Sequence, residues 1–353
     1  MLKMDNISFL ERKIDRRSFL KISGILGMGI ASAGIIPGKA GAVDTNRKLY
    51  KDSEAILAMG TTVSMTLVYH SRKKAEEAMA LAFKEIDRLS GLMNRFDEKS
   101  PISRLNRDGR LENAPPDLIK VIEASLYYNN LTNGIFDITI TPVLDLFGKK
   151  FSKGSEKGPS EKEIKKVLEL VGSDLIEIGG SNISFRKKGM SITLDGIAKG
   201  YAVDMASKIL LKHDIKNHLI NAGGDIFVMG LRIDGKPWRV GVLNPEKGKE
   251  PEIIIDLTGA AIATSGNYEN FFDREKMFHH IVNPKTGLSP IVNVSASVIA
   301  PTAMEADALA TSMMIMSPGE GLKFIDSLPE CESLIIERNG RIVKSSGWKN
   351  FAI

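Results

Sequence analysis

The chain has 353 residues, of which 43% are hydrophobic and 26% are charged, with 48 Lys and Arg against 43 Asp and Glu. This is the composition of an ordinary globular protein, which excludes a disordered tail protein, a collagen-like repeat and a multi-span membrane protein. The single cysteine, Cys331, excludes intrachain disulfides, thiolate zinc ribbons and Cys-x-x-Cys redox chemistry. The formal charge of +5 suggests an acidic partner such as nucleic acid or phosphate.

Residues 1–42 have the three parts of an export signal. Basic residues precede the uncharged run Ile22–Ile36, and Ala40-x-Ala42 follows as a small-residue cleavage pattern. The run of 15 residues is shorter than the roughly 20 that cross a bilayer. The stretch 15–21, DRRSFLK, resembles a twin-arginine signal. We therefore expect export in the folded state, to the periplasm or the outer face of the cytoplasmic membrane.

This segment also holds most of the net charge. It contains seven Lys and Arg and three acidic residues, so that its net charge of +4 leaves the remaining chain, 43–353, at +1. A nucleic-acid partner loses its main support, and we expect none. Membrane association is expected only if the signal stays uncleaved.

Residues 43–353 are expected to form one compact domain. After a polar stretch to about residue 51, alternation over Thr62–Val68 predicts a half-buried strand. Apolar residues at three- and four-residue steps predict a helix over 72–93, followed by a polar loop, Asn94–Gly109. A second helix is expected over Pro116–Leu131, ended by Asn133-Gly134.

Strands dominate the second half of the chain. A lysine- and glycine-rich excursion, 149–166, includes the capping box Ser160-x-x-Glu163, which opens a helix that is expected to end at Gly172. Further helices are expected near 196–211, 303–316 and 318–328, and a hairpin near Asn339-Gly340. The expected strands cover 175–178, 183–185, 219–221, 226–229, 238–243, 253–257, 278–282 and 292–299. Because strict βαβ alternation is absent, we predict an α+β fold with a largely antiparallel sheet flanked by helices.

Asp307 and Thr311 lie four residues apart in a helix that Thr302 and Glu305 are expected to cap. Most of their neighbours are Ala or Met, so this face should be buried and its carboxylate needs a partner. A hard cation with oxygen ligands would supply one. A hydrogen bond to Thr311 or an ion pair with a lysine would do so equally well.

Three other segments carry residues that could take part in binding or catalysis. In 192–204, Asp195, Gly196 and Lys199 flank a strand-to-helix turn, where backbone N–H groups suit phosphate, although a plain turn fits as well. The stretch 221–225, NAGGD, is either a tight turn or a place where a ligand approaches bare backbone. His279 and His280 should point to opposite faces of a strand, so either a general base or a surface histidine is expected there.

Taken together, these segments resemble the ApbE family, the FAD:protein FMN transferases. The resemblance extends from 59–61 (MGT) to 307–311 (DALAT), nearly the whole chain after the signal. Each motif is weak alone, but eight occur in the order of the family. The intervening six are 93–96 (MNRF) with 103–106 (SRLN), 134–139 (GIFDIT), 195–201 (DGIAKGY), 221–225 (NAGGD), 264–266 (TSG) and 280–287 (HIVNPKTG).

The resemblance implies a reaction and a set of residues. FMN would pass from FAD, the substrate, to a Thr or Ser of an acceptor flavoprotein in a membrane or periplasmic electron-transfer system, and AMP would leave. Mg²⁺ would be held by Asp307, Thr311 and the Gly196 carbonyl. Lys199 would neutralise phosphate and His280 would be the base. Contacts to flavin and adenosine are expected at Met59, Phe96, Ile135, Phe136, Asp137, Lys199 and Ile281.

The chain departs from the family pattern at three positions. Thr193 stands where many members carry Asp, so either Thr193 or Asp195 is expected to contact the ligand. Phe96 replaces a common tyrosine, and Asn283 replaces a common Asp. Two alternative functions remain open at this point: an FAD pyrophosphatase, in which water replaces the acceptor hydroxyl, and a non-catalytic flavin-binding protein.

Overall fold

The computed structural model describes residues 48–152, 158–244, 251–268, 271–273 and 277–352. The expected export signal, 1–42, lies outside these residues, and so does the start of the expected domain. Within the described ranges, no helix combines the length and the apolar character that a membrane span requires.

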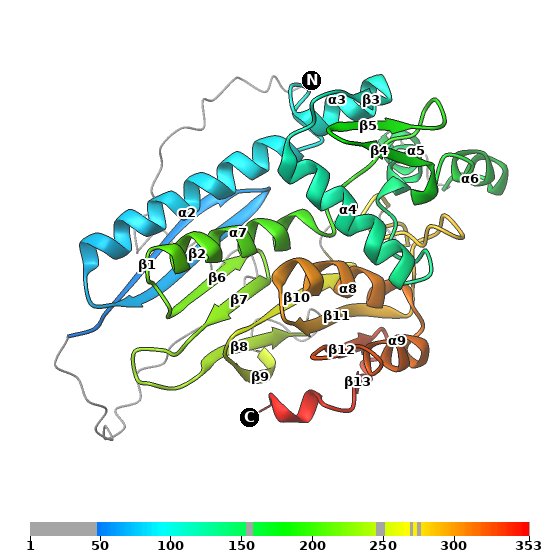
Figure 1. Ribbon diagram of the computed structural model, residues 1–353. Coiled ribbons are helices and arrows are strands. Elements are labelled where there is room, and N and C mark those ends of the chain that lie inside the picture. The colour runs from blue at the N-terminus through cyan, green and yellow to red at the C-terminus, as the bar shows by residue number, and fades with distance from the viewer. Residues whose placement is uncertain (1–47, 153–157, 245–250, 269–270, 274–276, 353) are drawn as a thin grey trace.

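An eight-stranded sheet forms the centre of the described chain, in the order β1-β2-β6-β7-β10-β11-β12-β13 (Figure 1). Every neighbouring pair is antiparallel, which confirms the predicted fold class. The strands are β1 Tyr50–Ala58, β2 Thr61–Tyr69, β6 His218–Ala222, β7 Asp225–Met229, β10 Ala260–Gly266, β11 Asn293–Ala300, β12 Glu332–Glu337 and β13 Ile342–Lys344.

Helices cover one face of this sheet. α2 and α7 pack side by side, and α7 in turn packs against α8, which lies over β10 and β11 (Figure 1). Their apolar stripes meet the inward side chains of the strands in one large cluster. The helices are α2 Arg72–Met93, α3 Pro101–Asp108, α4 Pro116–Leu131, α5 Thr141–Ser152, α6 Glu161–Leu168, α7 Ala198–Lys212, α8 Ala303–Ile315 and α9 Pro318–Ile325.

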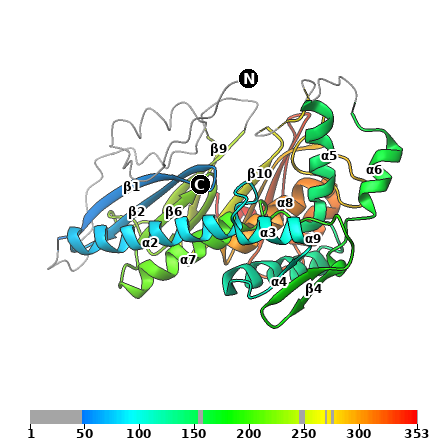
Figure 2. The same ribbon diagram turned by 90° about the horizontal axis from the view of Figure 1, so that it is seen from above.

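The opposite face is covered by a hairpin and the C-terminal segment. The strands β8 Trp238–Leu243 and β9 Pro251–Leu257 pair with each other, and a 3₁₀ turn at Trp348–Asn350 packs beside them. Alternate residues of β7 show the division, because Phe227 faces the helices while Ile226 and Val228 face the hairpin. Figure 2 shows α2 and α7 on one side of the sheet and β9 on the other.

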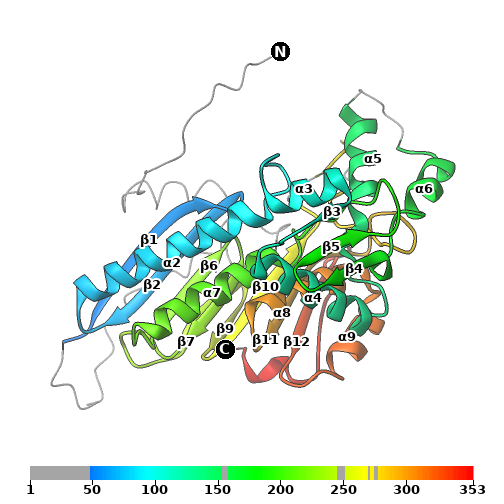
Figure 3. The same ribbon diagram turned by 45° about the horizontal axis from the view of Figure 1, so that its top comes forward.

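A smaller sheet and two helices gather at one end of the molecule (Figure 3). This sheet has the order β3-β5-β4, formed by β3 Arg110–Leu111, β4 Ile176–Gly179 and β5 Asn182–Phe185. Nearby, α5 contributes to a third apolar cluster that includes Phe147 and Val282. This cluster brings the chain around residue 282 close to α5.

Most of the predicted elements are present, and several are corrected. The capping box at Ser160 and Glu163 is confirmed, although its helix ends at Leu168 rather than Gly172. The predicted loop 94–109 contains α3, because Ser100 caps a helix that has Pro101 in its first turn. The predicted strand 278–282 is wrong: this segment makes one isolated bridge, between His279 and Phe271.

Candidate active site

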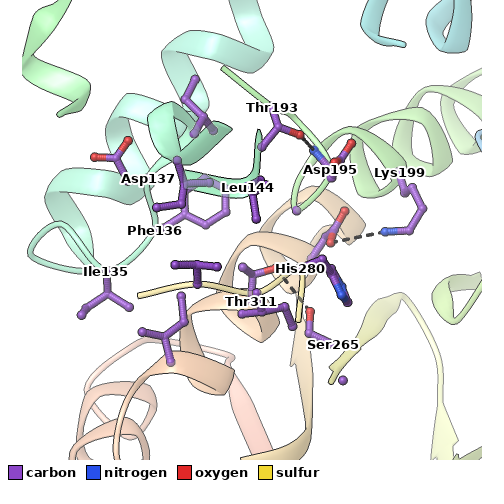
Figure 4. A pocket seen from close by; sticks show the side chains of 18 of the residues that line it. Ile135, Phe136, Asp137, Leu144, Thr193, Asp195, Lys199, Ser265, His280 and Thr311 are labelled. Atoms are coloured by element: carbon purple, nitrogen blue, oxygen red, sulfur yellow. Dashed lines mark hydrogen bonds and ion pairs between the residues drawn. The ribbon is translucent and has the colours of Figure 1, made fainter. Parts of the chain in front are cut away.

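One pocket of about 140 Å³ opens beside the N-terminus of α7 and the middle of α8. Side chains from both halves of the chain surround it (Figure 4). The described residues that line it are Arg95, Ile135, Phe136, Asp137, Ile138, Ile140, Leu144, Thr193, Asp195, Gly196, Lys199, Gly223, Thr264, Ser265, Gly266, Phe272, His280, Ile281, Val282, Asp307, Thr311 and Ile315. The structure therefore brings together eleven of the thirteen residues that the sequence singled out; Met59 and Phe96 are the exceptions.

The two helices at the pocket cap each other. Asp307 on α8 accepts the backbone N–H of Gly200 in the first turn of α7, at 3.1 Å. Asp204 on α7 accepts the N–H groups of Ala303 and Met304 at the start of α8, at 2.8 and 3.0 Å. Each carboxylate thus satisfies amides that the other helix cannot pair internally. This exchange fixes the position of Asp307 relative to α7.

Gly200 allows the helices to come this close. A Cβ at this position would lie 2.2 Å from the carbonyl oxygen of Ala303, far inside van der Waals contact. The glycine in the 195–201 motif is therefore required by packing. Its absent side chain lets Asp307 reach the N-terminus of α7.

Lys199 lies between two buried carboxylates. Its Nζ is 2.9 Å from Asp225 Oδ2 and 3.8 Å from Asp307 Oδ1, and both aspartates are about 2% exposed. Burial, together with the nearby Asp225 carboxylate, raises the pKa of Asp307 well above its ordinary value. Burial also raises the pKa of Asp225, and the Lys199 ammonium opposes this effect. Such a pair of carboxylates favours a second positive charge beside Lys199.

The oxygen atoms around Asp307 suit a hard divalent cation. Thr311 Oγ1 lies one helical turn further along α8, 3.3 Å from Ser265 Oγ. Gly196 faces this hydroxyl, since a Cβ on Gly196 would lie 2.8 Å from Thr311 Oγ1. Carboxylate, hydroxyl and carbonyl oxygens are ligands that Mg²⁺ accepts, with phosphate and water completing its shell. In the described ranges, His, Cys, Asp and Glu form no group of three placed to hold a metal.

The two adjacent histidines have different surroundings. His279 is fully buried, and its Nε2 bonds to the carbonyl oxygen of Pro290 at 2.9 Å. Burial lowers the pKa of His279 to about 4, so this ring stays neutral and structural. His280 is turned into the pocket, on the same side as Lys199, Ser265 and Thr311 (Figure 4). The opposed orientations follow the prediction, although the segment is not a strand.

The other side of the pocket is mainly apolar. Ile135, Phe136 and Leu144 lie there (Figure 4), with Phe272 and Val282 also among the lining residues. Flat, weakly polar rings such as flavin and adenine fit a wall of this kind.

Asp137 lines the pocket, but its carboxylate points away from the polar side (Figure 4). It accepts hydrogen bonds from Thr139 N at 2.8 Å, Ser173 Oγ at 2.9 Å and Asn129 Nδ2 at 3.1 Å. The side chain therefore holds the 135–140 loop in place. This local role is a sufficient reason for an aspartate at this position.

Two of the predicted ligand contacts lie outside the pocket lining. Met59 sits in the two-residue turn between β1 and β2, with a positive φ of 52°. That turn is next to Gly223, where a Cβ would meet the Thr61 side chain at 2.5 Å. Phe96 is 76% exposed, and the guanidinium of Arg95 lies 4.3 Å from its ring centre. Arg95, rather than Phe96, contributes to the pocket.

Thr193 and Asp195 have separate tasks. Thr193 Oγ1 accepts the Asp195 N–H at 3.2 Å and thereby shapes the turn before α7. The Asp195 carboxylate receives Arg95 Nε at 3.3 Å. The sequence did not assign roles to Arg95, Asp225 or Ser265, although all three lie within or next to the recognised motifs. Nothing in a single sequence showed that these segments meet at one pocket.

Comparison with known proteins identifies the family of this chain. The model of the ApbE family matches residues 59–335. The chain belongs to the ApbE family. The FAD:protein FMN transferase of Haemophilus influenzae is 29% identical, over 84% of this chain and 91% of that protein. The enzyme of the same name from Vibrio cholerae is 32% identical over 67% of this chain and 74% of its own.

Solved structures agree with this membership. An ApbE protein from Thermotoga maritima superimposes with a TM-score of 0.77 and 30% identity, covering 87% of this chain and all of its own. The flavin transferase ApbE from Vibrio cholerae gives a TM-score of 0.74 and 25% identity, with 86% and 99% covered. The fold and the family of this chain are therefore established together.

Proposed function

We propose that this ApbE-family enzyme transfers the FMN half of FAD to a Thr or Ser hydroxyl of an acceptor flavoprotein and releases AMP. The observation that carries this proposal is the meeting of Asp307, Thr311, Lys199 and His280 at one pocket with an apolar wall. The names of the relatives support the same reaction. A pure binding protein would need the wall but no candidate base.

The charges that line the pocket support a role for Mg²⁺. The polar side of the pocket has two cations, Arg95 and Lys199, and the carboxylates of Asp195 and Asp307, and a third carboxylate, that of Asp225, pairs with Lys199. This balance disfavours an anionic pyrophosphate unless a cation is added. We propose that Asp307, Thr311 and the Gly196 carbonyl hold Mg²⁺. When bound, the metal would withdraw charge from the phosphate oxygens and orient them.

The residues of the chain would divide the remaining work. Lys199, held by Asp225, places a positive charge beside the pyrophosphate. The oxygen of the acceptor hydroxyl bonds to the FMN phosphorus, and His280 accepts the proton that this hydroxyl loses. The bond from this phosphorus to the bridging oxygen breaks, and AMP leaves with the electron pair. The apolar wall around Phe136 positions a ring system and keeps water away.

One incubation tests this function. The protein is mixed with FAD, Mg²⁺ and an acceptor flavoprotein domain, and the acceptor is examined by in-gel fluorescence and mass spectrometry. An FMN-sized mass increase on the acceptor, with one AMP per label, is expected. AMP and free FMN without labelling would instead establish an FAD pyrophosphatase. Bound FAD without AMP would establish a binding protein.

The role of His280 is tested by its substitution. We expect His280→Ala to bind FAD as the native protein does and to lose about 10²- to 10⁴-fold in transfer rate, the usual contribution of a general base. Raising the pH should restore part of the rate, since the acceptor hydroxyl then loses its proton more readily. His279→Ala is not a matched control, because His279 is buried in the loop. An unimpaired rate in His280→Ala would remove it as the base.

We further propose that the protein acts outside the cytoplasm. The support is the sequence of residues 1–42, with Arg16-Arg17 and the apolar run that follows. The acceptor would then be a flavoprotein of a membrane or periplasmic electron-transfer system. Fractionation of cells that produce the native chain and an Arg16→Lys, Arg17→Lys variant tests this. Unchanged recovery from the periplasm in the variant would reject the twin-arginine route.

A further inference from the structure

Arg95 is held at the edge of the pocket by its backbone. It follows the C-terminus of α2, and its carbonyl oxygen accepts the hydroxyl of Ser103 on α3 at 3.0 Å. Asn106 on α3 pairs through both ends of its amide with the backbone of Ile192, at 2.8 Å in each direction. α3 thereby holds the backbone of Arg95 and the segment that leads to Asp195 in a fixed position relative to each other. The fold thus sets the position of the Arg95 backbone.

The guanidinium is enclosed but poorly paired. The Arg95 side chain is only 18% exposed, yet it makes one hydrogen bond within the described part of the chain, from Nε to Asp195 Oδ2 at 3.3 Å. Asp145 is 3.9 Å from Nη1, which is too far for a hydrogen bond. A guanidinium has five N–H donors, and enclosing them without acceptors costs free energy.

Its neighbours do not depend on Arg95 in return. The side chains of Asp195 and Asp145 are 56% and 65% exposed, so water satisfies both carboxylates. The Phe96 ring centre lies 4.3 Å from Cζ of Arg95, so the ring limits where the guanidinium can move. Arg95 itself lines the pocket. An anion bound in that pocket would supply the missing acceptors.

We propose that Arg95 is a phosphate-binding residue for the dinucleotide, separate from Lys199. A planar guanidinium can donate two parallel hydrogen bonds to one phosphate, whereas the Lys199 ammonium acts as a point charge. The two cations also have different ion-pair partners, since Lys199 is paired with the buried Asp225 and Arg95 with the exposed Asp195. Binding of FAD would release Arg95 from Asp195 and give it stronger acceptors. This inference rests on the proposed function.

The test compares FAD binding by Arg95→Gln with binding by the native protein and by Arg107→Gln. Arg107 is 59% exposed and pairs with Asp108, so its substitution removes the same charge away from the pocket. With Mg²⁺ present, we expect Arg95→Gln to raise the Kd for FAD by about 10- to 100-fold, the range for a hydrogen bond to a charged group. Arg107→Gln should leave the Kd unchanged. Thermal unfolding checks that each variant is folded.

Inorganic pyrophosphate distinguishes a phosphate contact from a packing effect. It carries the charge of the dinucleotide without its rings, and it should displace FAD from the native protein. The concentration needed for displacement should rise at least tenfold in Arg95→Gln. Equal displacement in both proteins, or none in the native one, would overturn the role of Arg95 even if FAD affinity fell. Absence of FAD binding by the native protein would instead reject the proposed function.

Discussion

The two faces of the central sheet are built for different purposes. The face under α7 and α8 buries two carboxylates, Asp225 and Asp307, and leaves a pocket beside them. The face under the β8–β9 hairpin is closed by apolar side chains, including Trp238 and Trp348. Burying charge costs free energy, while burying apolar surface gains it. We infer that the helix face combines the larger apolar cluster with the buried charges of the site, whereas the hairpin face contributes apolar packing alone.

Truncation of the hairpin face is expected to have the largest effect on stability. Trp348 is fully buried between the C-terminal segment and the sheet. Trp348→Ala should lower the free energy of unfolding by about 3–5 kcal/mol, the usual loss for a buried aromatic residue. Below the melting temperature of the variant, its KM for FAD should match that of the native protein. Denaturant unfolding measures the stability and steady-state kinetics measure the KM. A changed KM would show that the hairpin face influences the site on the helix face.

The helix face is also expected to be sensitive to acid. His218 on β6 is fully buried and bonds to Ser207 Oγ and the Ile215 carbonyl, and burial lowers its pKa to about 4. The unfolded chain, with a histidine pKa near 6.5, takes up the proton first as the pH falls. The part of the stability that depends on neutral His218 is therefore lost between about pH 6.5 and 4, by up to about 3 kcal/mol.

The comparison that isolates this residue is the pH dependence of unfolding in His218→Gln. Its free energy of unfolding should be lower at pH 7, but it should fall less steeply between pH 6.5 and 4 than in the native protein. Urea unfolding at a series of pH values gives both slopes. Parallel slopes would show that His218 does not carry the acid sensitivity.

A smaller effect is expected at the contact between α7 and α8. Gly200→Ala places a methyl group against the carbonyl oxygen of Ala303, so the helices must separate. This should lower the free energy of unfolding by about 1–3 kcal/mol. Because Asp307 binds the Gly200 N–H, the transfer rate should fall as well. Gly91→Ala is the matched control: Gly91 is in α2 with open space around it, and the change should stabilise by up to about 1 kcal/mol. Equal stability of the two variants would mean that the contact is not tight.

The sequence predicted the fold where local patterns dominate. The periodicity of α2 and the capping box at Ser160 depend on near neighbours, and both are found as expected. β10 was missed because its residues, AAIATSG, are small and lack a strand pattern, and its burial comes from packing under α8. The segment 278–282 has the pattern of a strand, but it forms only one isolated bridge, between His279 and Phe271.

The site was predictable through its motifs, though not through its contacts. Asp307 and Thr311 could be placed on one helix face by spacing alone. The ion pair of Lys199 with Asp225, and that of Arg95 with Asp195, join residues 26 and 100 positions apart, which no local pattern reports. Phe96 was selected as an aromatic contact, yet the fold turns its neighbour Arg95 into the pocket. Tertiary contacts decide which residue of a motif faces the ligand.

The most direct test of the proposed site is FMN transfer by Asp307→Asn, measured over a range of Mg²⁺ concentrations. Asp87→Asn, on the exposed face of α2, is the control for the lost charge. Since Asp307 is buried beside another carboxylate, Asp307→Asn should remain folded and should melt no lower than the native protein without Mg²⁺. Its transfer rate should stay at background at every Mg²⁺ concentration. A native rate with native Mg²⁺ dependence would contradict the site.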